Sequence, residues 1–197
     1  MYPQPTFDFY SVLNKVLPKR PDVIDMISGI PNVAAALINQ SRELGFTGLV
    51  VAGACVGDAN VLNDMVTPKY AYNIIQYSPD VNSDKMTDSV KKLGQKIKAS
   101  GSPWQLDATF VLDAVLALKS VVETAQTLDT HEIVAAIDNG VAKDFEGIWG
   151  PAVWGSLPSL YGSKHCGEHA PMLSIVKDGQ VQFEWLPWDG AASDFDL

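Results

Sequence analysis

Apolar segments of two kinds alternate along the first 78 residues of the chain. In one kind the apolar side chains recur every three or four residues, and in the other they form short continuous runs. The first spacing is typical of amphipathic helices, and the second is typical of buried strands. The predicted helices span residues 9–17, 33–44 and 59–66, and the predicted strands span residues 22–29, 48–53 and 70–77. This alternation predicts a parallel sheet covered by helices on both faces.

The pattern changes after residue 80. A lysine-rich amphipathic helix is predicted over residues 83–99, a long apolar helix over 107–126, and a shorter one over 130–139 with Thr130 as its N-cap. Three consecutive helices without intervening strands interrupt the alternation. We expect them to pack on a sheet that something else supplies.

The last 50 residues carry strong strand and turn signals. Residues 145–151 predict the entry into a strand, with Gly147 and Gly150 as breakers, and residues 155–170 form a polar loop. The closing segment 172–186 holds two apolar runs around Asp178-Gly179, which predicts a β-hairpin.

Composition narrows the possible functions. The chain has 197 residues, of which 47% are hydrophobic, and a net charge of -9. Its basic residues are scattered, which argues against nucleic acid as a partner. Residues 1–5 do not resemble a signal peptide. Either the protein is cytoplasmic, or Met1 lies inside a longer protein; we favour the second hypothesis.

Two groups of residues invite a chemical interpretation. His165, Cys166, Glu168 and His169 carry donors that suit a transition metal, although five residues rarely complete a four-ligand site. Cys55 and Cys166 either form a disulfide or are separate thiols. The loop 53–58 lacks the glycine pattern and lysine of a phosphate-binding loop, so we interpret it as a strand-to-helix turn that faces a ligand.

The order of these elements, up to about Leu186, resembles the C-terminal portion of the solute-binding proteins of branched-chain amino-acid type ABC transporters. The strings that carry the resemblance are Asp8-Phe9, Pro21–Ile24, Gly45-Phe46, Asp113–Val115, the pair Gly147 and Gly150, and Lys177–Gly179. The resemblance implies an α/β fold, a Rossmann-like lobe of a type I periplasmic binding protein, with helices that belong to a partly missing first lobe.

It also implies how the chain is divided. Residues 1–80 would form an α/β segment of the second lobe, residues 81–147 a helical segment of the first lobe, and residues 148–197 a return to the second lobe. We therefore expect a truncated chain, with a signal peptide upstream of Met1 and a periplasmic or extracellular location. Exposed helix faces in the first-lobe segment predict a homo-oligomer or a domain swap.

The resemblance places a ligand at the loops that follow the strands. The expected ligand-binding residues are Ile30, Pro31, Ala54, Cys55, Tyr77 and Trp104. Amino-acid binders of this family place an aromatic residue near Ile30 and a glutamate at Ala54. Because this chain has neither, an amide or a small organic or aromatic acid is as suitable a ligand as an amino acid.

The implied function is solute capture for an ABC importer, with the transporter's membrane subunits as partners. Capture proceeds by closure of two lobes on the ligand, without catalysis, cofactor or metal. One alternative is a ligand-sensing regulator or receptor domain of the same fold. The other is a small metal-dependent α/β enzyme that uses the segment His165–His169.

Overall fold

The three apolar runs of the N-terminal part each contain a short parallel strand. The computed structural model describes residues 7–26, 30–53, 59–102, 104, 106–154, 167–170 and 172–186. The parallel strands are β1 (Val23–Asp25), β2 (Leu49–Val51) and β3 (Ile74–Gln76). Ile24 lies opposite Val50, and Val50 lies opposite Ile74. The three strands are shorter than predicted. In the run 70–77, which contains β3, the first residue belongs to the 3-10 turn η2 (Pro68–Tyr70) instead.

The predicted C-terminal hairpin extends this sheet. It consists of β7 (Met172–Lys177) and β8 (Gln180–Trp185), and β7 runs antiparallel to β3 with Ile75 opposite Ile175. The strand order is β1-β2-β3-β7-β8. This mixed sheet with its parallel strands confirms the predicted α/β fold class.

Contacts between residues divide the chain into two compact units. The parallel-sheet unit comprises Met1–Met86, Ile97–Leu106 and Met172–Glu184, and the helix-rich unit comprises Thr87–Lys96, Asp107–Pro171 and Trp185–Leu197. The division into segments 1–80, 81–147 and 148–197 stays a prediction about lobes of a larger protein.

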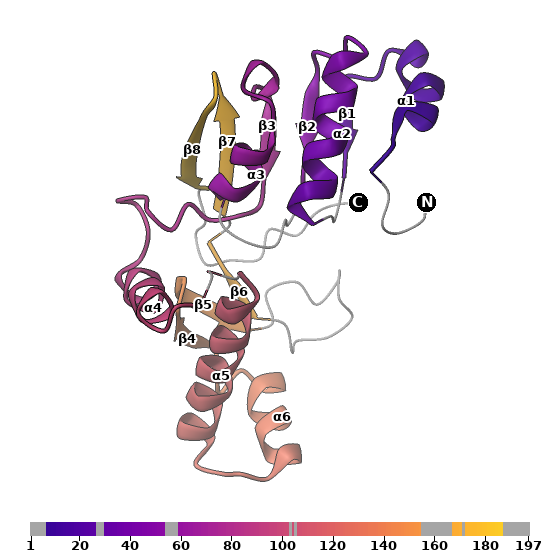
Figure 1. Ribbon diagram of the computed structural model, residues 1–197. Helices are drawn as coiled ribbons and strands as arrows, with labels where there is room; N and C mark the ends of the chain where they lie inside the picture. The colour runs from indigo at the N-terminus through magenta and orange to yellow at the C-terminus, as the bar shows by residue number, and fades with distance from the viewer. Residues whose placement is uncertain are drawn as a thin grey trace. The chain divides into compact units, whose positions relative to one another are not determined.

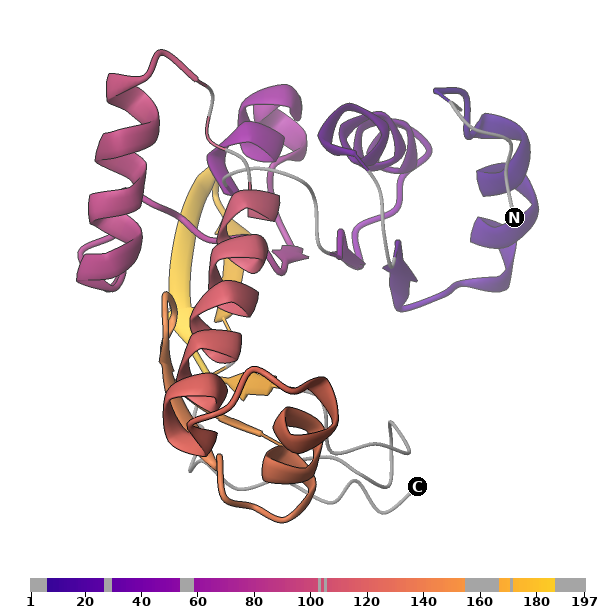
Figure 2. The same ribbon diagram turned by 90° about the horizontal axis from the view of Figure 1, so that it is seen from below.

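In the parallel-sheet unit, α2 (Pro31–Glu43) and α3 (Ala59–Met65) lie on the same face of the sheet, and α1 (Tyr10–Val16) lies beside α2 (Figures 1 and 2). Their apolar side chains meet those of the strands in one core. Its fully buried members include Val33, Ala34, Ile38, Val50, Leu62, Ile74 and Val176. The helical spacing of the α2 residues is the feature that predicted this face.

Helix α2 begins two residues earlier than predicted. Ile30 is its N-cap, and no side chain caps it. Pro31 occupies the first helical position, where the missing N–H would have no intrahelical partner in any case. Gly45, which has φ +86°, follows the helix as predicted.

Arg42, near the end of α2, is 5% exposed and has no carboxylate partner among the residues that the structure describes. Its Nη1 donates to the carbonyl oxygens of Phe46 and Gly48 at 2.9 Å, and its Nη2 donates to that of Tyr72 at 2.9 Å. The guanidinium carbon lies 5.3 Å from the ring centroid of Phe46 and 4.4 Å from that of Tyr72. Burial lowers the pKa of Arg42, although an arginine remains charged near neutral pH. One side chain thus joins α2 to the segments that precede β2 and β3.

The hairpin turn is also tied to the rest of this unit. Asp178 and Gly179 both have positive φ, 51° and 78°, as a type I′ turn requires. The N–H of Gly179 donates to the carbonyl of Ala71 at 2.8 Å, and its carbonyl accepts from Nδ2 of Asn63 at 3.2 Å. The turn is therefore held against both α3 and the segment before β3.

The helix-rich unit has a sheet of its own, of which the sequence predicted only the strand entry at residues 145–151. Its strands are β4 (Asp144–Gly147), β5 (Gly150–Trp154) and β6 (Gly167–His169), all antiparallel. β6 lies in the segment predicted as a polar loop, because Gly-Glu-His shows no strand pattern. Helices α5 (Leu106–Ala125) and α6 (Thr130–Asp138) follow α4 (Asp88–Ala99), and Asp129, not Thr130, caps α6 by accepting from His131 and Glu132.

This sheet covers one face of α5. Ala117 of α5 packs with Phe145 and Ala152, and Val121 packs with α6 and Trp154. The chain therefore supplies part of the sheet that we expected from elsewhere. Away from this face, α5 exposes Val111, Val115 and Leu118, each between 54% and 67%. Among the described helices, none is both long and apolar enough to cross a membrane.

A single close approach joins α5 to the turn between β4 and β5. Oδ1 of Asp113 accepts from the N–H of Ile148 at 2.7 Å. A Cβ on Gly147 would lie 2.3 Å from the same oxygen. Gly147 is thus required for the approach of the carboxylate, not for a turn conformation.

We predict that Arg42→Met lowers the free energy of unfolding by about 2–3 kcal/mol, because buried carbonyls lose a charged donor. Arg42→Lys should recover little, because an ammonium cannot reproduce the planar fork. Urea unfolding followed by circular dichroism measures both. Lys15→Met removes an exposed cation and should stay within about 0.5 kcal/mol of the unchanged chain. Equal stability of the Arg42→Met and Lys15→Met proteins would contradict the role given to Arg42.

We predict that Gly147→Ala destabilises the helix-rich unit by about 1–3 kcal/mol, because the new methyl group must displace the Asp113 carboxylate. In an Asp113→Ala background the same substitution should cost less, because the obstructing atoms are gone. A double-mutant cycle with tryptophan fluorescence as the unfolding signal tests this. Strictly additive effects would show that the two residues are not coupled.

Candidate ligand-binding site

The carboxyl ends of the three parallel strands form one edge of the sheet. Backbone hydrogen bonds continue past the strands, from Met26 to Val51 at 2.8 Å, and from Tyr77 to Gly53 at 3.0 Å. In parallel sheets, ligands bind outside this edge, where loops from several strands meet. We refer to it below as the carboxyl edge.

Three of the predicted site residues lie at the carboxyl edge. Ile30 is the N-cap of α2 and Pro31 is its first residue, and Ile30 is 48% exposed in extended conformation. Tyr77 directly follows β3 and is 49% exposed. β2 lies between β1 and β3, so these residues flank the position where the chain leaves β2. Exposed apolar side chains at a strand-end edge are suited to contact with an apolar ligand.

The remaining predicted residues differ in what the structure says of them. Ala54 and Cys55 lie outside the described residues, and so does Cys166, so the possible Cys55–Cys166 disulfide stays a prediction. Trp104 is half-buried, and its indole Nε1 is buried without a hydrogen-bond partner. Contacts group Trp104 with the parallel-sheet unit. No hydrogen bond or ring contact between described residues connects it to Ile30 or Tyr77.

The structure adds polar residues that sequence reasoning missed. Gln76, the last residue of β3, is fully buried, and its Nε2 donates to the carbonyl of Ala59 at 2.9 Å. The N–H of Ala59 donates to the carbonyl of Pro79 at 2.7 Å. The start of α3 is therefore fixed to β3 and to the loop that follows it. A glutamine within an otherwise apolar strand was the available signal.

A second set of hydrogen bonds holds the loop after β3. The hydroxyl of Ser174, on β7, donates to the carbonyl of Ser78 at 2.6 Å, and both residues are fully buried. Nδ2 of Asn60 donates to Oδ1 of Asp80 at 3.1 Å. These contacts make the carboxyl edge a defined surface next to Tyr77. As described, it offers apolar contact and hydrogen-bonding groups but shows no nucleophile paired with a base.

The histidine-rich string predicted as a possible metal site is only partly described. Nδ1 of His169 lies 2.8 Å from the carbonyl oxygen of Ala170, and its ring stacks on Trp149 with centroids 6.2 Å apart. His165 and Cys166 lie outside the described residues. Within the described part of the chain, no three His, Cys, Asp or Glu side chains are placed to share a metal ion.

Comparison with known proteins relates this arrangement to a family. A family model described as periplasmic binding protein matches residues 1–158. No protein with a curated function matches the chain significantly.

Solved structures of solute-binding proteins share the fold. The leucine-binding protein LivK of Thermotoga maritima is 22% identical, with a TM-score of 0.62, over 93% of this chain and 49% of its own. LivJ of Streptococcus pneumoniae, in complex with isoleucine, is 21% identical, with a TM-score of 0.59, over 94% and 50%. A solute-binding protein of R. palustris, in complex with benzoate, is 15% identical, with a TM-score of 0.61, over 98% and 52%.

This chain spans about half the length of each of these proteins. The family-model match covers most of the chain, and the fold class is the α/β class that the resemblance implied. The chain therefore belongs to the periplasmic binding protein family, whose members bind solutes and are not enzymes.

Proposed function

We propose that this chain contributes one side of the ligand-binding cleft of a solute-binding protein that serves an ABC importer. The observation that carries the proposal is the carboxyl edge. There Ile30, Pro31 and Tyr77 present apolar surface beside loops that are held by the hydrogen bonds of Gln76 and Ser174. The same edge is the ligand-binding position of parallel α/β sheets. The protein acts by closure of two lobes on the solute, and the transporter's membrane subunits are its partners.

In this proposal, residues 1–80 and the closing hairpin belong to the second lobe. The helices of the segment 81–147 belong to the first lobe. Because contacts group β4, β5 and β6 with α5 and α6, we place the return to the second lobe at Met172 instead of residue 148. A periplasmic or extracellular location follows from this role, as for the solute-binding proteins with the same fold.

The ligand class follows from the exposed side chains. The aromatic ring of Tyr77 and the aliphatic Ile30 favour a small solute with an apolar body. The related structures hold isoleucine, benzoate and 4-hydroxybenzoate. We propose an amino acid, an amide or a small organic or aromatic acid, contacted by Ile30, Pro31, Ala54, Cys55, Tyr77 and Trp104.

We predict that one member of a panel of isoleucine, benzoate and benzamide binds at the carboxyl edge. Tyr77→Ala should weaken that binding about tenfold, since an aromatic contact of this size contributes on the order of 1–2 kcal/mol. Tyr77→Phe keeps the ring and separates its contribution from that of the hydroxyl. Calorimetric titration of the 197-residue chain gives the affinities.

Tyr10→Ala provides the control for this titration. Tyr10 is an exposed tyrosine of α1 whose hydroxyl donates to Glu43. Its replacement should leave the affinity unchanged. Equal losses in the Tyr77→Ala and Tyr10→Ala proteins, or no binding of any panel member, would contradict the proposed cleft.

The uncovered face of α5 supports the predicted self-association. Val111, Val115 and Leu118 are spaced by four and three residues, so they form one stripe. A stripe of this kind on an otherwise water-exposed helix favours association. We propose that in the isolated chain a second copy covers it.

We predict that the chain elutes as a dimer or larger species in size-exclusion chromatography with light scattering. Val111→Glu combined with Leu118→Lys should shift it to the monomer, because two charges would be buried at the contact. Leu128→Glu changes an 84% exposed residue outside the stripe and should leave the assembly unchanged. A monomeric unmodified chain would overturn the self-association.

A further inference from the structure

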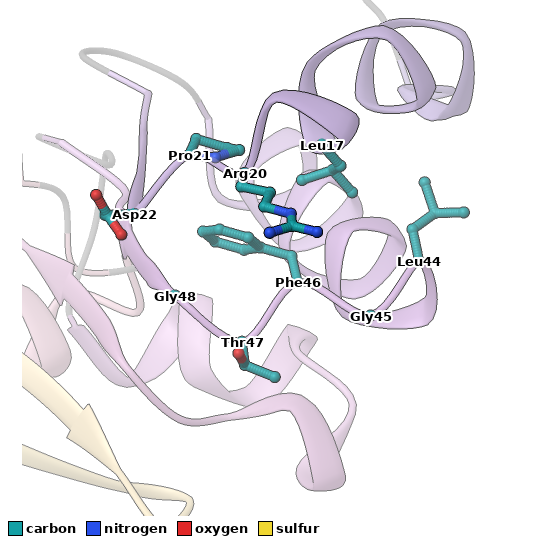
Figure 3. Close-up of a pocket in the computed structure, with 9 residues that line it drawn as sticks. All are labelled: Leu17, Arg20, Pro21, Asp22, Leu44, Gly45, Phe46, Thr47 and Gly48. Atoms are coloured by element: carbon teal, nitrogen blue, oxygen red, sulfur yellow. The ribbon is translucent and has the colours of Figure 1, made fainter.

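A cavity lies at the edge of the same sheet opposite to the carboxyl edge. It is a half-open cavity of about 370 Å³ at the amino ends of β1 and β2. Its lining residues are Leu17, Arg20, Pro21, Asp22, Leu44, Gly45, Phe46, Thr47 and Gly48 (Figure 3). Asp22 precedes β1 and Gly48 precedes β2, whereas Ile30 and Tyr77 lie beyond the other strand ends. The cavity is therefore separate from the carboxyl edge.

The cavity combines apolar walls with one cation. Leu17 and Leu44 supply aliphatic surface, and the buried Phe46 and the cation Arg20 also line the cavity (Figure 3). The chain has only two arginines, and the other, Arg42, is occupied by backbone carbonyls. Arg20 forms no ion pair with any residue in the described ranges, the cavity's own Asp22 included. The cavity thus holds a charged donor without a partner.

The backbone of Arg20 is unusual for its residue type. Arg20 ends the 3-10 turn η1 (Leu17–Lys19) in left-handed conformation, with φ 56° and ψ 55°, and Pro21 follows. Glycine or asparagine adopts this conformation more readily, and a following proline restricts it further. An unfavourable conformation retained beside a cavity is a reason to examine function. A requirement for the guanidinium would account for an arginine at this position.

Local charge favours an anion despite the net charge of -9. Lys15, Lys19 and Arg20 bring three cations into six residues without an acidic residue between them. Asp22 at the rim opposes an anion, but in Figure 3 its carboxylate lies on the other side of Phe46 from the Arg20 guanidinium. A guanidinium matches the geometry of a carboxylate in a bidentate pair. A cavity of this volume is within the range of small-molecule sites.

We propose that this cavity is a second binding site, which takes a small monocarboxylate with an apolar body. Arg20 binds the carboxylate, and Leu17, Leu44 and Phe46 enclose the apolar part. The site is independent of the proposed cleft, because none of its residues belongs to the carboxyl edge. It would give the protein a response to a carboxylate other than the captured solute.

The test is a titration of the ¹⁵N-labelled 197-residue chain with benzoate and with neutral benzamide, followed by backbone amide shifts. Benzoate should shift the amides of Arg20, Phe46 and Gly48, and benzamide should bind there at least about tenfold more weakly, because it lacks the charge-assisted pair. Binding at the carboxyl edge would instead shift Gly53 and Tyr77. Failure of one site is therefore distinguishable from failure of the other.

Arg20→Gly gives a variant that removes the cation while relieving the backbone. Its melting temperature should equal or exceed that of the unmodified chain, and its affinity for benzoate at the cavity should fall at least about tenfold. Arg20→Asn should behave alike, because asparagine also tolerates the left-handed region. Lys92→Ala, which removes an exposed cation of α4 outside the cavity, should change the affinity less than about twofold. Unshifted cavity amides, equal binding of benzamide, or undiminished binding by Arg20→Gly would each overturn the proposal.

Discussion

The buried guanidinium of Arg42 is the interaction on which the parallel-sheet unit depends. Parallel strands that are only three residues long have few ladder hydrogen bonds to fix their register. Arg42 compensates for this shortage. It forms no ion pair with a described carboxylate, and its guanidinium donates instead to carbonyl oxygens that precede β2 and β3. Because an unpaired buried charge is costly, any structure that separated these carbonyls would be strongly disfavoured. The arrangement therefore fixes α2 relative to both strands at their amino ends.

Fixing one edge of the sheet leaves the other free to carry function. At the carboxyl edge, the hydrogen bonds from Gln76 to Ala59, from Ser174 to Ser78 and from Asn60 to Asp80 orient loops instead of closing the surface. Ile30 and Tyr77 remain half exposed beside these hydrogen-bonded loops. A surface whose loops are already held by hydrogen bonds needs less rearrangement to bind a solute than a surface that must first be assembled.

The sequence predicted those features that arise from local periodicity. Apolar runs located the parallel strands, helical spacing located α2, and Asp178-Gly179 located the closing hairpin, because each is encoded by neighbouring residues. It did not predict β6, whose three residues become a strand only by pairing with β5. The hydrogen bond from the N–H of Ile148 to Asp113 joins positions 35 residues apart, and no local pattern encodes it. At the candidate site, Tyr77 could be proposed from its place at the end of a predicted strand. The role of Gln76 depends on its hydrogen bond to Ala59, which is distant in the sequence.

The two arginines show why residue type alone does not reveal a role. Both lie near the amino ends of β1 and β2, yet Arg42 is 5% exposed and donates to backbone carbonyls, whereas Arg20 is exposed and lines a cavity. Helical spacing places Arg42 on the inner face of α2, where only backbone acceptors are within reach. Arg20 follows the turn η1, is itself in left-handed conformation, and is exposed. A buried guanidinium that donates to backbone carbonyls stabilises a fold, and an exposed one without an ion pair among the described residues has the capacity to bind an anion.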